Sequence, residues 1–299
     1  MTLQEAINTF LDATAGEIAD STHAWYASML ASMAAYLGEN RPVDSLSPAD
    51  MRAWRSWVRK QPTQRGGPPS VASLNGHTKA ARRLFSWLMN EGLANSNPAK
   101  ALKIRKIKQV PKAISEADYL AILRAAEADG LRSRLMVLLL ADTGCRINAL
   151  ASAKVEHISL NEADQSGSLL LREKGSRMHR VYFGAETYKA LTFWLDRRPT
   201  RTDWLFPSRT NPGHLLPATM RYNLYRLARD AGASGRCNPH SFRHRYARTF
   251  LQRGGNLAAL QRLMGHADVS ITARYYAVWA ESELADWHKM ASPAKAGLS

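Results

Sequence analysis

Two adjacent tyrosines, Tyr275 and Tyr276, lie near the end of the chain in the stretch SITARYYAVW. A phenol becomes a strong nucleophile once it loses its proton, and its ordinary pKa of about 10 means that it needs help to do so. His266 precedes the pair, just after a short predicted helix that Asn256 caps. Ser270 is expected to begin the helix of the tyrosines, where neighbouring residues point about 100° apart. Only one tyrosine can therefore face the same pocket as His266, and the other packs or faces solvent.

A second set of reactive groups is predicted at the start of a helix in NPHSFRHRYARTFLQRGG. Asn238 stands at the N-cap position and Pro239 at the first helical position. His240 and Arg243 share a helix face in the first turns, where free N–H groups and the helix dipole favour a phosphate. An imidazole and a guanidinium together can donate several hydrogen bonds to one phosphate. Alone, the pair is equally consistent with a basic surface helix or with a His240 satisfied inside the core.

Arg146 and Lys174 are two further candidates for binding an anion. Arg146 follows a Thr-Gly turn at the end of RLMVLLLADTG, which is apolar nearly all round and is expected to be a buried helix. A guanidinium beside such a helix is costly unless it meets an anion or a partner carboxylate such as Asp142. Lys174 is expected at the tip of a β-hairpin over 167–184, where alternating residues flank a Lys-Gly-Ser break. A lysine in an exposed turn is common, so its position alone decides little.

The charge of the chain points to a polyanionic partner. The 299 residues carry a formal net charge of +16, and the sequence pI is about 10.1. The charge is uneven: residues 1–50 sum to −6, residues 51–110 to +12 and residues 111–299 to +10. A basic block on a folded chain favours nucleic acid, although a solvated basic face is the plainer alternative. No apolar run is long enough to span a membrane, and two cysteines predict no disulfide framework and a reducing, cytoplasmic location.

The patterning predicts a mainly α fold with a small antiparallel β-sheet, an α+β class. Residues 1–99 read as an N-terminal helical bundle, with Ser47 capping one helix and Gly92 stopping another. Residues 100–112 form a linker with six lysines or arginines and no acid, suited to a phosphate backbone or simply solvated. Residues 113–299 form a second domain, which begins with a helix that Ser115 caps.

The order of these signals resembles that of the tyrosine recombinases, also called phage-type integrases. The resemblance rests on TGCRINALASAKVEHI, REKGSRMHRVYF, PHSFRHRYARTF and LMGHADVSITARYY, and it covers essentially the whole chain. It implies a tyrosine-recombinase catalytic domain, with Tyr275 as nucleophile and Tyr276 as the alternative. The other residues that it assigns to the active site are Arg146, Lys174, His240, Arg243 and His266.

One position departs from the family pattern. Relatives often carry an acidic residue three positions after the first arginine as a support, and here that position is Ala149. The orientation of Arg146 is then expected to rest on another group, for which Asp142 is a candidate, or the activity is weak.

The resemblance implies that DNA strands are cut and rejoined through a 3′-phosphotyrosyl bond, in integration, excision, resolution or transposition. Two arginines and a histidine offset the charge that attack on a phosphodiester builds. The tyrosine loses its proton either to His240, the candidate base, or simply through the cationic field of the pocket, and Lys174 is the candidate acid for the leaving 5′-oxygen. No metal, other cofactor or small-molecule substrate is expected.

The expected partners are double-stranded DNA and further copies of the same chain. The resemblance implies a homotetramer on paired sites, with the helical module and the catalytic domain gripping the duplex. It also implies that a C-terminal segment, 279–290, docks on a neighbouring copy. The expected location is the cytoplasm, where DNA binding associates the protein with the nucleoid.

Three alternatives remain on the sequence alone. A type IB topoisomerase shares the pocket but relaxes supercoils as a monomer, and the N-terminal module and the LMGH context favour a recombinase instead. A catalytically silent DNA-binding relative is disfavoured because all six expected positions are filled. A zinc site on Cys237, His240 and His244 lacks a second cysteine at a suitable spacing.

Overall fold

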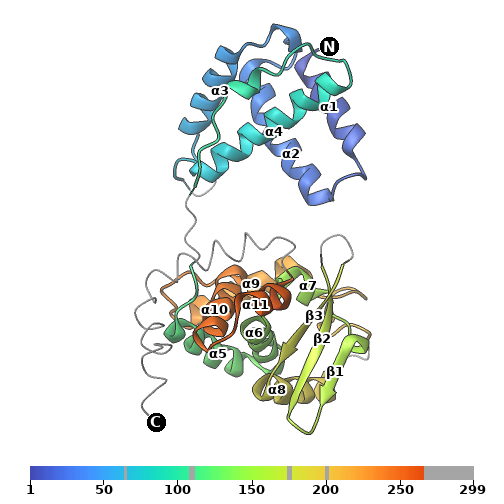
Figure 1. The fold of residues 1–299 in the computed structure, drawn as a ribbon, viewed down its shortest axis with the longest axis vertical. Coiled ribbons are helices and arrows are strands. Elements are labelled where there is room, and N and C mark those ends of the chain that lie inside the picture. Colours follow the sequence, from blue (N-terminus) through green and yellow to red (C-terminus); the bar gives the residue numbers. More distant parts are fainter. Residues whose placement is uncertain (64–65, 108–111, 174–176, 199–201, 266–299) are drawn as a thin grey trace, which may run out of the picture. The chain divides into compact units, whose positions relative to one another are not determined.

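The chain forms two compact units, Met1–Gln109 and Val110–Ser299, in a computed structural model. The structure describes residues 1–63, 66–107, 112–173, 177–198 and 202–265 (Figure 1). Lys174, His266, both tyrosines and the expected docking segment 279–290 lie outside the described residues. Among the residues described, no helix is both long and apolar enough to cross a membrane.

The first unit is a helical bundle around an aromatic and aliphatic core. Ser47 caps α3 as predicted, because its side chain accepts from the Asp50 amide while Asp50 binds back to the Ser47 amide. Trp54, Phe10 and Phe85 are fully buried in the core. The helices of this unit are α1 Leu3–Thr14, α2 Asp20–Leu37, α3 Pro48–Lys60 and α4 Val71–Asn90, with the 3-10 turns η1 Val43–Ser45 and η2 Pro98–Ala101.

The second unit is built around α6 Leu131–Thr143, the helix predicted to be buried. Nine of its thirteen residues are buried, which explains why its sequence shows no polar face. A three-stranded sheet lies on one side of α6, and helices α5 Glu116–Asp129 and α10 Pro239–Gln252 lie on the other (Figure 1). The remaining elements described are α7 Ile147–Ala151, η3 Val155–His157, α8 Ala185–Arg197, α9 Pro217–Asp230 and α11 Leu257–Met264.

The sheet is antiparallel in the order β1-β2-β3. The predicted hairpin is confirmed as β2 Ser166–Arg172 paired with β3 Met178–Phe183, with Leu169 opposite Val181. These two side chains are buried, as the alternation requires. The strand β1 Ile158–Asn161 was not predicted, because its four residues are mostly exposed and leave no alternating pattern. The predicted class, mainly α with a small antiparallel sheet, is thus confirmed.

The end of α6 is a tight passage that only glycine fits. Gly144 adopts a left-handed conformation with φ 59°, and a Cβ there would lie 2.5 Å from the ring of Tyr246 on α10. The turn at Gly144 therefore lies directly against α10. Cys145 and Arg146 are the next two residues of the chain.

We expect Gly144→Ala to destabilise the second unit by about 2–5 kcal/mol, the sum of left-handed strain and overpacking. Gly232→Ala is the matched control, because Gly232 has a similar φ of 64° but nothing within 4 Å of its would-be Cβ. It should cost only the strain, about 1–2 kcal/mol. Chemical denaturation of both variants measures the difference, and equal losses would show that contact with Tyr246 contributes nothing.

Candidate active site

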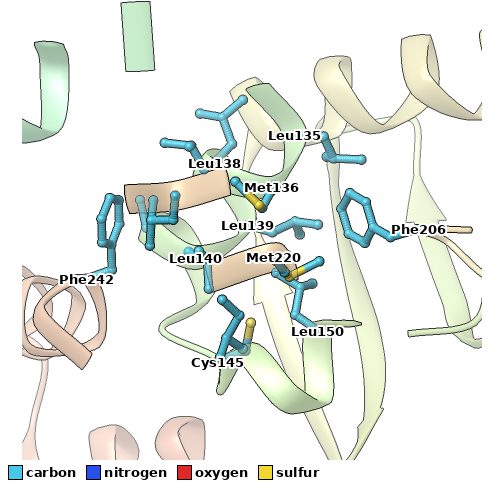
Figure 2. Packing of buried hydrophobic residues seen from close by; sticks show 14 of the residues in the cluster. Leu135, Met136, Leu138, Leu139, Leu140, Cys145, Leu150, Phe206, Met220 and Phe242 are labelled. Carbon is cyan, nitrogen blue, oxygen red and sulfur yellow. The ribbon is translucent and has the colours of Figure 1, made fainter. Parts of the chain in front are cut away.

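The two candidate arginines are presented by backbone that is anchored in the hydrophobic core. Cys145 and Ile147 flank Arg146, and both are buried. Phe242 precedes Arg243 and is fully buried against the same cluster, which Figure 2 shows around Leu139, Leu140 and Cys145. Close packing on both flanks leaves the arginine backbone little freedom, so these side chains start from defined positions.

Arg243 is a buried cation held by backbone carbonyls. It is only 5% exposed; its Nη1 donates to the Gly144 carbonyl at 2.7 Å and its Nη2 to the Met264 carbonyl at 2.5 Å. These carbonyls stand at the ends of α6 and α11, where helix dipoles favour a positive charge. Burial and the nearby Arg146 lower the pKa of Arg243 to about 10, so it stays charged at neutral pH.

Arg146 forms its ion pair with Glu173, at the end of β2. The expectation that Asp142 supports this arginine is wrong. The Asp142 carboxylate instead accepts from the Gly184 amide at 2.9 Å and the Thr187 hydroxyl at 2.7 Å, at the start of α8. The Arg146 side chain is 39% exposed and the Glu173 side chain 7%, so the arginine can still reach a ligand.

The Glu173 carboxyl is held ionised. Burial alone raises its pKa, but the neighbouring His179 ring and the charge of Arg146 together lower it below its ordinary value. The His179 Nδ1 atom lies 3.6 Å from the second Glu173 oxygen, too far for a hydrogen bond. Its Nε2 atom lies 3.0 Å from the Arg262 carbonyl on α11.

His240 faces a strongly positive environment. It is exposed in the first turn of α10, which begins with the predicted Asn238 capping box. Partial desolvation and the charges of Arg243, Arg146 and other arginines lower its pKa. His240 is therefore neutral at pH 7 and able to accept a proton.

Three of the six predicted site residues thus share one surface: Arg146, His240 and Arg243. Lys174 and His266 lie outside the described residues, as do Tyr275 and its alternative, Tyr276. The residues just before Lys174 and His266 are described. Glu173 contacts Arg146, and a Cβ on Gly265 would lie 3.0 Å from the His179 ring.

The arrangement is suited to an anion. The positive charges of Arg236 and Arg221 also lower the pKa of His240. Glu173 is the carboxylate that pairs with Arg146. Among the described residues, no group of three or more His, Cys, Asp or Glu side chains could hold a metal ion. The zinc alternative on Cys237, His240 and His244, all of them described, therefore finds no support. A phosphate diester would bring the negative charge that this surface lacks.

Comparison with known proteins decides the family. The family model described as "Phage integrase family" matches residues 112–282, more than half of the chain. The chain belongs to the phage integrase family of tyrosine recombinases.

Curated recombinases match along nearly the whole chain. The tyrosine recombinase XerC of Alcanivorax borkumensis is 31% identical over 283 residues, which cover 91% of this chain and 88% of that protein. The tyrosine recombinase XerD of Pseudomonas putida is 31% identical over 311 residues, with 96% and 97% covered. A lambda integrase dimer bound to a COC′ core site has a similar fold, with a TM-score of 0.73, 19% identity and 92% and 77% covered.

The protein is therefore a site-specific DNA recombinase, an enzyme that transfers DNA strands. A DNA recombinase acts on DNA, in keeping with the nucleic-acid partner that the basic composition favours. Membership does not assign the individual catalytic residues, which remain predictions from the motifs.

Sequence reasoning missed Glu173, His179, Arg221 and Arg236 as members of this surface. Glu173 had one available signal, its place next to Lys174. Arg221, whose Nη1 donates to the Asn148 amide oxygen at 3.2 Å, reaches the site from α9 and had none.

His244 couples the site to the pH dependence of stability. Burial, His240 and nearby arginines lower its pKa to about 4, whereas an unfolded chain has a pKa near 6.5. Between these two pH values His244 binds more protons in the unfolded chain than in the folded one. The stability that neutral His244 contributes is therefore fully present above about pH 6.5 and is lost as the pH falls towards 4.

We expect His244→Asn to flatten this fall, by at most about 1.4 kcal/mol per pH unit for one proton. Urea unfolding between pH 4 and 7 measures the slope for the second unit, with His157→Asn, outside the site, as control. A slope identical to that of the wild type would contradict the assignment.

Proposed function

We propose that Tyr275 attacks a scissile DNA phosphate and becomes linked to it through a 3′-phosphotyrosyl bond. Tyr276 then packs or faces solvent, because neighbours on a helix point about 100° apart. The phosphate would be held by Arg146, His240, Arg243 and His266, and the leaving strand would take its proton from Lys174.

The convergence of Arg146 and Arg243 carries this proposal. Each of two neighbouring cations makes the other harder to keep protonated, so Arg146 contributes to the lowered pKa of Arg243. Proteins place cations together where an anion is to be bound. The trigonal-bipyramidal transition state carries more negative charge on its oxygens than the ground state, so preorganised guanidinium donors stabilise it selectively.

The lowered pKa of His240 supports its role as the base. A neutral imidazole can accept the phenol proton as the tyrosine oxygen forms its bond to phosphorus. In the same step the bond from phosphorus to the 5′-oxygen breaks, and the Lys174 ammonium protonates that oxygen. The 5′-hydroxyl of a partner strand later attacks the phosphotyrosine and gives its proton to the Lys174 amine. The bond from phosphorus to the tyrosine oxygen breaks, that oxygen takes back the proton held by His240, and the phosphodiester is restored without ATP or a cofactor.

We propose that a basic linker, residues 100–112, joins domains 1–99 and 113–299 and binds DNA. The described part of this linker, residues 100–107, supports that role. Its backbone is held by polar side chains: Arg82 donates to the carbonyls of Lys100 at 2.9 Å and Leu102 at 2.5 Å. Asn75 Nδ2 donates to the Arg105 carbonyl at 2.8 Å. With its carbonyls engaged, the segment leaves its cationic side chains exposed, which suits a phosphate backbone.

The stoichiometry of strand exchange supports a homotetramer on paired sites. Two duplexes have four strands, and each tyrosine can hold one strand end. Four copies, with segment 279–290 docking on a neighbour, would therefore complete the reaction. The reaction would take place in the cytoplasm on nucleoid DNA, in keeping with two buried free cysteines.

We expect Tyr275→Phe to bind DNA but to form no covalent adduct, because it keeps the ring and loses the nucleophilic oxygen. Wild type, Tyr275→Phe and Tyr276→Phe are incubated with a pool of nicked duplexes with randomised arms, and adducts are separated on denaturing gels. Tyr276→Phe should still form adducts. Loss with Tyr276→Phe alone would move the nucleophile by one residue.

Lys103→Gln and Lys106→Gln should each weaken binding to a duplex of arbitrary sequence. If each lysine contacts one phosphate, the slope of log K against log salt should become shallower by about 0.9 per substitution. Lys189→Gln on α8 is the charge-matched control and should leave the slope unchanged. Anisotropy titrations over a range of salt concentrations measure the slopes, and equal slopes in all variants would contradict the DNA-binding role of segment 100–107.

A further inference from the structure

Arg146 receives its carboxylate from an unexpected place. Position 149, one turn into α7, is an alanine that is only 3% exposed and packs in the core. The carboxylate comes instead from Glu173, 27 residues further along the chain at the end of β2. The pair joins the start of α7 to the hairpin.

Glu173 bonds to Arg146 through one of its two carboxylate oxygens. Oε2 pairs with the Arg146 Nη1 atom, and Oε1 faces the His179 Nδ1 atom at 3.6 Å. His179 in turn reaches the Arg262 carbonyl at 3.0 Å, at the end of α11. The carboxylate therefore joins the start of α7 to the end of β2, and His179 separately joins β3 to α11, the helix that precedes His266.

The burial of Glu173 indicates a permanent role for this carboxylate. Its side chain is 7% exposed, and a buried carboxylate is costly unless it is paired. The Arg146 side chain, at 39% exposure, is the open member of the pair. An arginine has five N–H donors in a rigid fork, so one Nη can hold Glu173 while the remaining donors face a ligand.

We propose that Glu173 is a positioning residue that orients Arg146 towards the scissile phosphate, in place of an acidic side chain at position 149. This inference rests on the proposed function, because it needs Arg146 to bind that phosphate. Glu173 itself would not touch the DNA. It fixes the rotamer of the guanidinium before the substrate arrives, which lowers the cost of ordering the site in the transition state.

A competing role for Glu173 predicts the opposite effect on the rate of cleavage. If Glu173 merely occupied Arg146 until a phosphate displaced it, removal of its charge would strengthen DNA binding and raise the rate of cleavage. If Glu173 positions Arg146, removal of its charge slows cleavage in the bound complex and leaves affinity nearly unchanged.

The experiment compares wild type, Glu173→Gln, Glu173→Asp and Asp129→Asn on a duplex that wild type captures covalently from the randomised pool. Asp129→Asn is the matched control, because it removes one charge and an ion pair, Arg226 to Asp129 at 2.7 Å, on α5 and α9. Adduct formation is timed under single turnover with saturating protein. Affinity is measured separately on the intact duplex, and thermal unfolding confirms that each variant is folded.

Glu173→Gln should slow adduct formation roughly 10- to 100-fold relative to Asp129→Asn, the usual cost of losing a supporting carboxylate or misplacing a reacting group. Its Kd should stay within about twofold of the control, a difference of only ~0.4 kcal/mol. Glu173→Asp, which keeps the charge but shortens the reach, should fall between wild type and Glu173→Gln. If Glu173→Gln does not fold, a slowed Glu173→Asp with unchanged Kd supports the same conclusion.

A Glu173→Gln rate equal to or above that of the control would overturn the positioning role while leaving the proposed function intact. Absence of any adduct with wild type, despite binding to the pool, would instead overturn the proposed function and this inference with it. The two failures are therefore distinguished by the wild-type lane alone.

Discussion

The burial of the Arg243 charge is the constraint on which the site depends. A cation that is 5% exposed must find acceptors, and here they are the carbonyls of Gly144 and Met264. These carbonyls end α6 and α11, so one guanidinium joins three helices, α10 included. Gly144 must be left-handed to turn its carbonyl this way, and Tyr246 fills the space beside it. The geometry of the site is thus tied to core packing, because moving any of these helices would leave the buried Arg243 charge without its hydrogen-bond acceptors.

The same constraint explains why the surface favours a phosphate. Backbone carbonyls satisfy the hydrogen bonds of Arg243 but bring no full negative charge, so its positive charge is only partly offset. Arg146 adds a second cation, and its partner Glu173 offsets one charge. Burial is the main reason that the pKa values of Arg243 and His240 are lowered, and the neighbouring arginines lower both further. In the proposed function a DNA phosphate would supply the missing negative charge at this site.

Much of this arrangement could be predicted from local sequence. Ser47 and Asn238 mark the starts of their helices because capping is a short-range interaction. The middle of α6, residues 135–141, is apolar all round because every one of these residues is buried. The hairpin follows from alternation. What could not be predicted depends on register and long-range packing: β1 is too exposed to show a pattern, and the pairing of Arg146 with Glu173 requires the end of β2 to lie beside the start of α7. Asp142 is nearer to Arg146 in sequence, yet it faces α8.

The identity of residue 149 has a physical consequence for the whole domain. An acidic side chain at that position would have to be accommodated where α7 packs on the core, and alanine avoids that desolvation cost. A carboxylate supplied by β2 leaves α7 free to pack, but it ties the orientation of Arg146 to the order of the hairpin. A separate contact, from His179 on β3 to the Arg262 carbonyl, ties the hairpin to the end of α11. Elements that carry separate parts of the predicted active site therefore share one carboxylate, and a disturbance of the hairpin reaches the arginine directly.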